Sequence, residues 1–136
     1  MALPQLTPVE NWTKIINDNF AKTDPANLNW TKIDNPCTPL NGAKIKSSVL
    51  YYANIGQTKL CVLSIVGLQV NPLVQGNAYF DVPANFVPDH TVAMSIDQTG
   101  YAARHTDSTG FQIWSNDSAV SYGNGTATWV HADGNL

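Results

Sequence analysis

Charged side chains are scarce in this chain. They make up 12% of its 136 residues, about half the usual share, and the net charge at neutral pH is −3. Arginine occurs once, as Arg104, and glutamate once, as Glu10. Binding to nucleic acid requires clustered lysine and arginine side chains that displace counterions. The composition therefore argues against a nucleic-acid partner.

Long apolar runs are also missing. No stretch approaches the roughly 18 consecutive apolar residues of a membrane-spanning helix, so no membrane insertion is expected. No charged segment followed by an apolar one opens the chain, and we therefore expect no signal peptide. Hydrophobic residues still make up 43% of the sequence, which is enough for the packed core of a single domain.

The residues that hold metals or disulfides are few and badly spaced for either role. Cys37 falls in a proline-rich stretch and Cys61 in an apolar one, and both are expected to be free thiols. The three histidines, His90, His105 and His131, do not have the spacing of metal ligands. The sequence therefore predicts neither a metal site nor a cofactor.

Catalytic motifs are absent as well. There is no Gly-x-Ser-x-Gly elbow and no phosphate-binding loop. Glu10 is better explained as a helix cap, and the nine aspartates fall mostly in expected turns. Because no opposed pair of carboxylates can be identified, we expect a protein that is not an enzyme.

The most informative stretch present is Leu60–Val70. Its apolar residues occupy both even and odd positions, whereas a strand with one wet face would alternate. This pattern predicts a central strand that is covered on both faces. The second cover is expected from a neighbouring copy of the chain, with Leu63 and Ile65 among the oligomer contacts.

An amphipathic helix is predicted near the N-terminus. Thr7-Pro8-Val9-Glu10 is a capping box, and the pattern ends before Asp24-Pro25. Its apolar stripe consists of Val9, Trp12, Ile16 and Phe20. Because so short a helix is marginal alone, it should pack either on its own β domain or in a bundle with other copies. We therefore assign residues 1–24 to assembly or docking, with Trp12, Ile16 and Phe20 as the contact residues.

The remainder reads as a linker, residues 25–42, followed by a β domain, residues 43–136. Short alternating segments separated by turn signals predict a mainly β fold, an antiparallel β-sandwich or jelly-roll-like head. A hairpin is expected around Gly56-Gln57, another around residues 107–110, and a third around Gly123-Asn124-Gly125. The strand at 43–55 is expected to turn its odd-numbered residues inward.

The β region resembles a known class of proteins. The segments VLSIVGLQV, GNAYFDVPANFVPDHTVAMSI, TGYAAR and STGFQIW are similar to the C-terminal β domain of bacteriophage tail-fibre and baseplate receptor-binding proteins. The corner Phe80–Pro88 departs from that pattern, with Asn85 in place of a glycine and Val87 in place of an arginine. The resemblance implies a homotrimer on the virion that binds a host-surface saccharide.

Candidate saccharide-binding residues gather in the C-terminal third. Sugar binding needs an exposed aromatic face and planar polar groups. Trp114 should point away from the core because Phe111 and Ile113 point into it, although it could instead pack against a neighbouring copy. Each of the other candidates also has an ordinary structural interpretation, as a core, solvated or ion-paired side chain. The candidate set is Trp114, Arg104, His105, Asp107, Trp129, His131 and Asp133.

The sequence thus predicts a phage tail or baseplate protein, assembled in the host cytoplasm and carried on the virion, which recognises a cell-surface polysaccharide without cleaving it. Its other partners would be virion tail or baseplate proteins. The alternative is a structural virion component, such as a head-decoration or baseplate connector protein, that binds no sugar. An enzyme, or a lectin unrelated to phage, is a further hypothesis.

Overall fold

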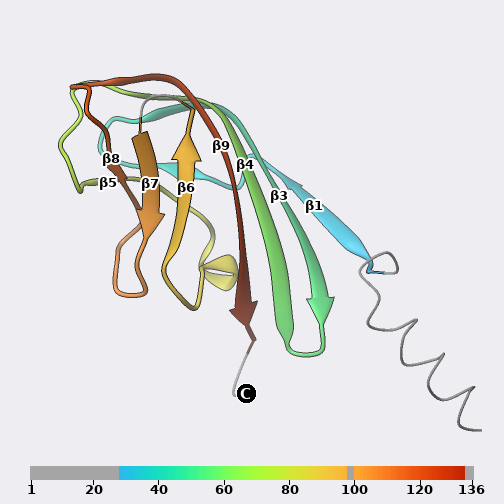
Figure 1. The fold of residues 1–136 in the computed structure, drawn as a ribbon. Helices are drawn as coiled ribbons and strands as arrows, with labels where there is room; N and C mark the ends of the chain where they lie inside the picture. The colour runs from blue at the N-terminus through green and yellow to red at the C-terminus, as the bar shows by residue number, and fades with distance from the viewer. Residues whose placement is uncertain (1–27, 98–99, 134–136) are drawn as a thin grey trace, which may run out of the picture.

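The computed structural model describes residues 28–97 and 100–133, and Figure 1 shows their arrangement. The predicted N-terminal helix, with Trp12, Ile16 and Phe20, lies outside the described residues. Within them the fold is mainly β, as expected. The strands are β1 (Trp30–Asp34), β2 (Thr38–Pro39), β3 (Lys44–Ile55), β4 (Thr58–Val70), β5 (Ala78–Asp81), β6 (Val92–Ile96), β7 (Gly100–Arg104), β8 (Phe111–Trp114) and β9 (Val120–Ala132), with one short 3-10 helix, η2 (Ala84–Phe86).

The strands form two antiparallel sheets that enclose one core. Sheet A has the order β1-β3-β4-β9, and sheet B has the order β2-β5-β8-β7-β6 (Figure 1). Aromatic side chains from both sheets meet between them: the Phe80 and Phe111 rings stack 4.7 Å apart, and Trp129 lies 6.0 Å from Phe111. Sheet A therefore packs on sheet B through the face that each turns inward.

The first two strands lie in the stretch that was expected to be a linker. β1 pairs with β3 along its whole length, and β2 pairs with β5. The prolines at 36 and 39 leave only two residues of β2 in regular pairing, since proline cannot donate to a ladder. The sheets consequently begin at Trp30 rather than at Ala43.

Within this chain β4 is fully buried on one face only, and the cover expected on its second face from a neighbouring copy stays a prediction. From Cys61 to Ile65 the odd-numbered residues are buried, and from Leu68 to Val70 the even-numbered ones are. The switch occurs at Gly67, whose φ of +71° interrupts the regular alternation. Two half-strands with opposite inward parity thus account for part of the apolar run, while Leu60, Val62 and Val66 lie on the outward face.

Two further predictions about these strands are wrong. Leu63 and Ile65, assigned to an oligomer contact, are 0% and 2% exposed inside their own chain. In the paired strand β3 the inward residues beyond the bend are Ser48, Leu50 and Tyr52, not the odd-numbered ones. The predicted hairpin around Gly56-Gln57 is confirmed, since Ile55 pairs with Thr58.

The turn predicted around Gly123-Asn124-Gly125 does not exist. These residues lie within one long strand, β9, which carries register irregularities against β4. A Cβ at Gly125 would lie 2.4 Å from the Ser95 carbonyl oxygen, so the glycine is needed where β9 crosses β6. Asn124 completes this junction by accepting the Gly67 N–H at 2.8 Å and donating to Asp97.

Candidate functional site

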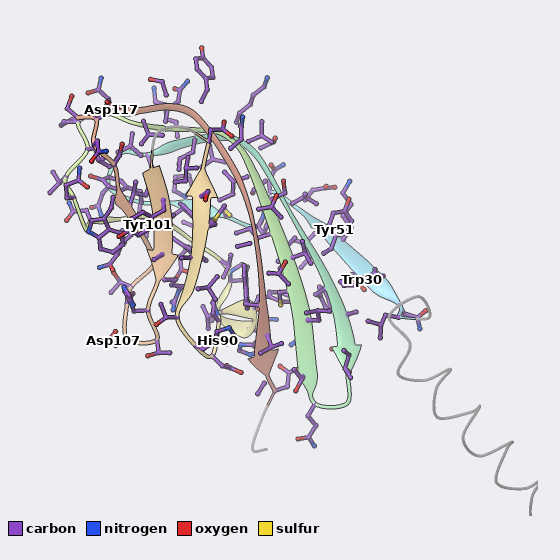
Figure 2. The ribbon with its side chains drawn as sticks, in the orientation of Figure 1. Trp30, Tyr51, His90, Tyr101, Asp107 and Asp117 are labelled. Atoms are coloured by element: carbon purple, nitrogen blue, oxygen red, sulfur yellow. The ribbon has the colours of Figure 1, made fainter. Side chains whose placement is uncertain are left out.

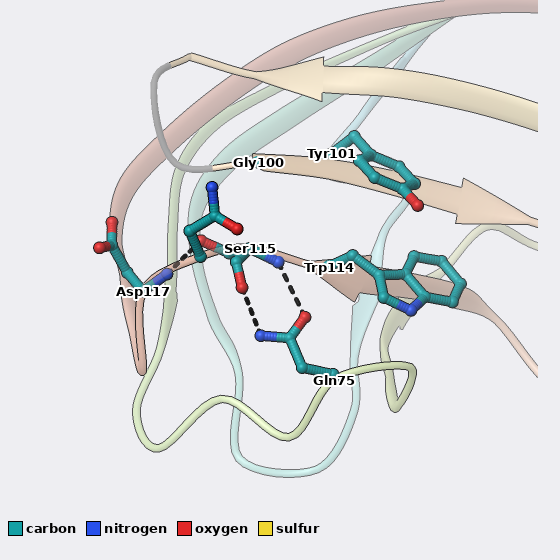
Figure 3. Close-up of a pocket in the computed structure, with 7 residues that line it drawn as sticks. Gln75, Gly100, Tyr101, Trp114, Ser115 and Asp117 are labelled. Atoms are coloured by element: carbon teal, nitrogen blue, oxygen red, sulfur yellow. Dashed lines mark hydrogen bonds between the residues drawn. The ribbon is translucent and has the colours of Figure 1, made fainter.

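A pair of stacked aromatic rings lies on the outward face of sheet B. Tyr101 on β7 and Trp114 on β8 are directly opposite each other in the ladder, so their side chains share one face. Their ring centroids are 5.4 Å apart with planes 20° from parallel, and Tyr101 is 49% exposed. Figure 3 shows the two rings side by side. Together they form an aromatic surface that is exposed at Tyr101 and half-buried at Trp114, called here the Tyr101–Trp114 platform.

The platform borders an open hollow of about 710 Å³. Its walls combine the two rings with the polar end of β8 and the loop before β5. The lining residues are Gln75, Gly100, Tyr101, Trp114, Ser115, Asn116 and Asp117. Amide, hydroxyl and carboxylate groups therefore surround an aromatic surface, an arrangement that can bind a ligand with one apolar face and several hydroxyl groups.

Gln75 fixes the loop that forms one wall. Its side-chain oxygen accepts the Ser115 N–H at 2.9 Å, and its amide nitrogen donates to the Ser115 carbonyl oxygen, as the dashed lines in Figure 3 show. The same loop is held to β8 by Gly76, whose N–H donates to the Ile113 carbonyl oxygen at 3.0 Å. The Trp114 indole passes 3.8 Å from the position of a Cβ on Gly76. The loop and the platform are therefore built as one unit.

Gly100 lets β7 approach β8 closely beside the hollow. Its φ is +144°, and a Cβ at this position would lie 2.1 Å from the Trp114 carbonyl oxygen. No side chain fits that space, because Cβ atoms in proteins essentially never come within 3.0 Å of another heavy atom. Glycine at position 100 is thus required for the pairing that sets Tyr101 against Trp114.

Two of the predicted site residues, Trp114 and His105, lie at the platform. Phe111 and Ile113 are fully buried and Trp114 points outward, as the alternation predicts. The His105 ring meets Trp114 edge-on at 6.2 Å and contacts the Thr91 hydroxyl at 3.3 Å. Asp107 is exposed in the loop that joins β7 to β8.

Arg104 and Trp129 must be removed from the candidate site because both are buried. Arg104 forms a bidentate pair with Asp81, with Nε 2.8 Å from Oδ1 and Nη2 3.1 Å from Oδ2. Trp129 is 2% exposed, and its indole N–H donates to the Phe86 carbonyl oxygen at 2.6 Å. A group that is buried and already bonded inside its own chain is not available to a ligand from outside.

His131 and Asp133 lie in a different cluster, at the C-terminal end of β9. The Lys59 ammonium is 2.6 Å from Asp133, and the His131 ring reaches the Val87 carbonyl oxygen at 2.6 Å. Asp89 lies 3.8 Å from the same ring and accepts the Ala132 N–H. These contacts tie the end of β9 to the corner after η2, so the cluster has a clear structural role.

The hairpin predicted around residues 107–110 already implies that Tyr101 lies opposite Trp114. With strands at 101–105 and 110–115, residue 105 faces residue 110, and counting back places 101 opposite 114. The structure has this register. Gln75 could not have been found in this way, because it comes from a loop that is 40 residues away in sequence from its partner Ser115.

Both cysteines are free thiols, as expected, and both are shielded. Burial raises the pKa of the Cys37 thiol to about 11, although a hydrogen bond from Ser48 opposes the shift. Burial likewise raises the pKa of Cys61 to about 11. A high pKa leaves almost no thiolate at neutral pH, so neither residue is a candidate nucleophile.

Residues 28–97 and 100–133 contain no group of three or more His, Cys, Asp or Glu side chains that could hold a metal ion. Across the same residues there is no helix with the length and apolarity needed to cross a membrane. Comparisons with protein-family models, with curated proteins and with solved structures find no significant match for this chain.

Proposed function

We propose that this protein is a non-catalytic saccharide-binding domain whose site is the Tyr101–Trp114 platform and its hollow. The observation that carries the proposal is the stacked pair of the exposed Tyr101 ring and the half-buried Trp114 ring, bordered by Gln75, Asn116 and Asp117. A pyranose ring presents an apolar C–H face that packs on aromatic rings, while its hydroxyls need planar amide and carboxylate partners. His105, which touches Trp114 edge-on, extends this surface.

The residues around the hollow favour binding over cleavage. Asp117 is the single carboxylate among the described residues that line it. Glycoside hydrolysis ordinarily uses two carboxyl groups on opposite sides of the scissile bond. With one carboxylate, the hollow can hydrogen-bond a sugar and has no acid–base pair to hydrolyse it.

The biological setting that we propose follows from the sequence resemblance to phage receptor-binding heads. The chain would be carried at the tail or baseplate of a virion as a homotrimer, and its ligand would be a polysaccharide of the bacterial surface. A single open hollow gives weak affinity, and many copies on one particle would make adsorption firm through avidity. The mainly β fold with two antiparallel sheets supports this setting without being specific to it.

A glycan array, followed by titration calorimetry with the best cell-wall saccharide, tests the site. Trp114→Ala should weaken binding at least about tenfold, because packing and burial of an aromatic ring contribute ~1.5–3 kcal/mol. Trp30→Ala is the matched control, since Trp30 is 44% exposed on sheet A, away from the hollow. Equal loss in both variants, or loss in neither, would contradict the proposed site.

One observation favours the alternative of a structural virion component. Several large apolar side chains are exposed on the outward face of sheet A, as a docking surface would require. If no saccharide binds and the chain instead co-purifies with a tail or baseplate protein, this role replaces sugar recognition. Sedimentation of the purified chain tests the trimer, which a monomeric mass would exclude.

A further inference from the structure

Exposed apolar side chains concentrate on one face of this molecule. Ladder pairing places Trp30, Ala53, Leu60 and Val130 in one row across the outward face of sheet A. The next row holds Lys32, Tyr51, Val62 and Thr128. Of the large apolar residues exposed by more than a third, five belong to this face: Trp30, Tyr51, Ile55, Val66 and Val130.

Figure 2 labels Trp30 and Tyr51 on β1 and β3, on the other side of the molecule from Tyr101 and Asp117. The face spans the four strands of sheet A, and its only ion pair among the described residues is Lys32 with Asp34 at the edge. Near the bend, a hollow of about 350 Å³ opens between Val49 and Val66. Single exposed apolar residues are ordinary, whereas a contiguous field of them calls for a cover.

The chain supplies a candidate cover of its own. We propose that residues 8–21 pack on the outward face of sheet A of the same chain, through the apolar stripe Val9, Trp12, Ile16 and Phe20. This stripe was predicted from the sequence alone to need a packing partner. The proposal is independent of the saccharide site, which lies on sheet B.

The point at which the described chain begins favours this occupant. β1 is the edge strand of sheet A, and its first residue, Trp30, is already on the face in question. The nine residues between Phe20 and Trp30 can span about 30 Å when extended, which exceeds the roughly 14 Å across four strands. A helix of 14 residues would be about 21 Å long, shorter than β4, so it fits along the sheet.

The charges on the two surfaces are also compatible with a contact between them. The predicted stripe of residues 8–21 carries no charged side chain, and Lys14 and Asp18 fall on the opposite side of the helix. On the sheet, Lys32 and Asp34 of the edge strand β1 pair with each other, and the positions that interrupt the apolar residues on β4 and β9 hold small neutral side chains, including Ser64, Thr126 and Thr128. Neither surface would bury an unpaired charge in the contact.

Thiol labelling of the full chain tests this proposal. A cysteine introduced by Thr128→Cys reports from β9, on the side of the face opposite β1, where the sandwich itself leaves position 128 exposed. If residues 8–21 cover it, adding Ile16→Asp should raise its labelling rate at least about tenfold, because the cover is then destabilised and the site opens. Labelling of the native cysteines, one half-buried and one buried, is measured in the parent chain and subtracted.

Two matched controls keep the result specific. Asn11→Asp adds the same charge to the opposite side of the predicted helix and should leave the labelling rate unchanged. Thr106→Cys reports from an exposed position in the loop between β7 and β8, and its rate should not respond to Ile16→Asp. An equal response to Asn11→Asp, or no response to Ile16→Asp, would overturn the proposal.

Serial dilution separates the same chain from a second copy. Protection by residues 8–21 of the same chain is intramolecular, so the labelling rate of Thr128→Cys should not change with protein concentration. A rate that rises on dilution would show that another copy covers the face, and would overturn the proposal. Fast labelling of Thr128→Cys at every concentration would show an open face and would overturn it equally.

Discussion

The outward faces of the two sheets carry similar aromatic residues and differ in what surrounds them. On sheet B, Tyr101 and Trp114 stack beside a hollow whose polar wall is fixed by Gln75. On sheet A, Trp30 and Tyr51 lie among aliphatic side chains and small hydroxyls, with the Lys32–Asp34 pair at the edge. An exposed aromatic residue alone does not indicate a ligand site. Fixed polar groups at its edge favour recognition of a hydroxylated ligand, and apolar neighbours favour a packing partner.

The largest effect that separates the two sheets is expected at their glycines. Gly100→Val on sheet B should destabilise the protein by about 4 kcal/mol, because any Cβ collides with the Trp114 carbonyl oxygen at a strained φ. Gly56→Ala at the hairpin of sheet A should cost only about 1 kcal/mol, since nothing lies within 4 Å of its added Cβ. Urea unfolding measures both, and equal costs would contradict the tight approach of β7 to β8.

The next largest effect is expected at the ion pair between Arg104 of β7 and Asp81 of β5 in sheet B. Arg104→Ala should lower the free energy of unfolding by about 2–4 kcal/mol, because it leaves the Asp81 carboxylate partly buried without its partner. Lys32→Ala should change stability little, since both partners of the Lys32–Asp34 pair on sheet A are largely exposed. The same denaturation series measures both variants. A small cost for Arg104→Ala would return that side chain to the list of possible ligand contacts.

A smaller effect is expected at the wall of the hollow. Gln75→Ala removes two hydrogen bonds to Ser115 and should cost about 1 kcal/mol of stability. Because the loop would then move away from the Tyr101–Trp114 platform, saccharide affinity should fall as well, by about tenfold. Thr128→Ala on sheet A is the control and should alter neither quantity. Calorimetric titration that finds unchanged affinity for Gln75→Ala would exclude the loop from the site.

The smallest effect appears only at alkaline pH. The pKa of each cysteine, ordinarily 9.0, is raised to about 11, so the folded state retains thiol protons that the unfolded state has released between these values. Stability should therefore be unaffected below pH 9 and should decline from pH 9 to 11. Cys61→Ala, from sheet A, and Cys37→Ser, before β2 of sheet B, should each flatten part of that decline. A profile unchanged by both substitutions would contradict the shifts.

Local patterns in the sequence predicted the elements whose partners are close in the chain. The hairpin of β3 and β4 follows from Gly56, whose φ of +61° suits a tight turn. The inward side of β6 follows from the alternation of Val92, Met94 and Ile96, all of which are buried. The outward direction of Trp114 was predicted correctly from the same alternation. The hairpin predicted around residues 107–110 also implies its pairing with Tyr101.

Long-range contacts decided what the patterns could not. Gly123 and Gly125 suggested a turn, and they serve instead to let β9 cross β6. Arg104 and Trp129 looked like ligand contacts because their chemistry suits a sugar, and their burial depends on Asp81 and Phe86, which are far away in sequence. No pattern within a strand reveals which distant residue will cover it.

The sequence by itself determined that this is a mainly β protein with little charge, free thiols and an outward-facing Trp114. The alternation of side chains and the chemistry of turns act over a few residues, so they can be read directly. Only the tertiary structure decided that the apolar run of β4 is two half-strands joined at Gly67, and that Gln75 completes the hollow. Both features depend on contacts between residues that are distant in sequence. In β4, the positive φ of Gly67 also reverses which side of the strand faces the core.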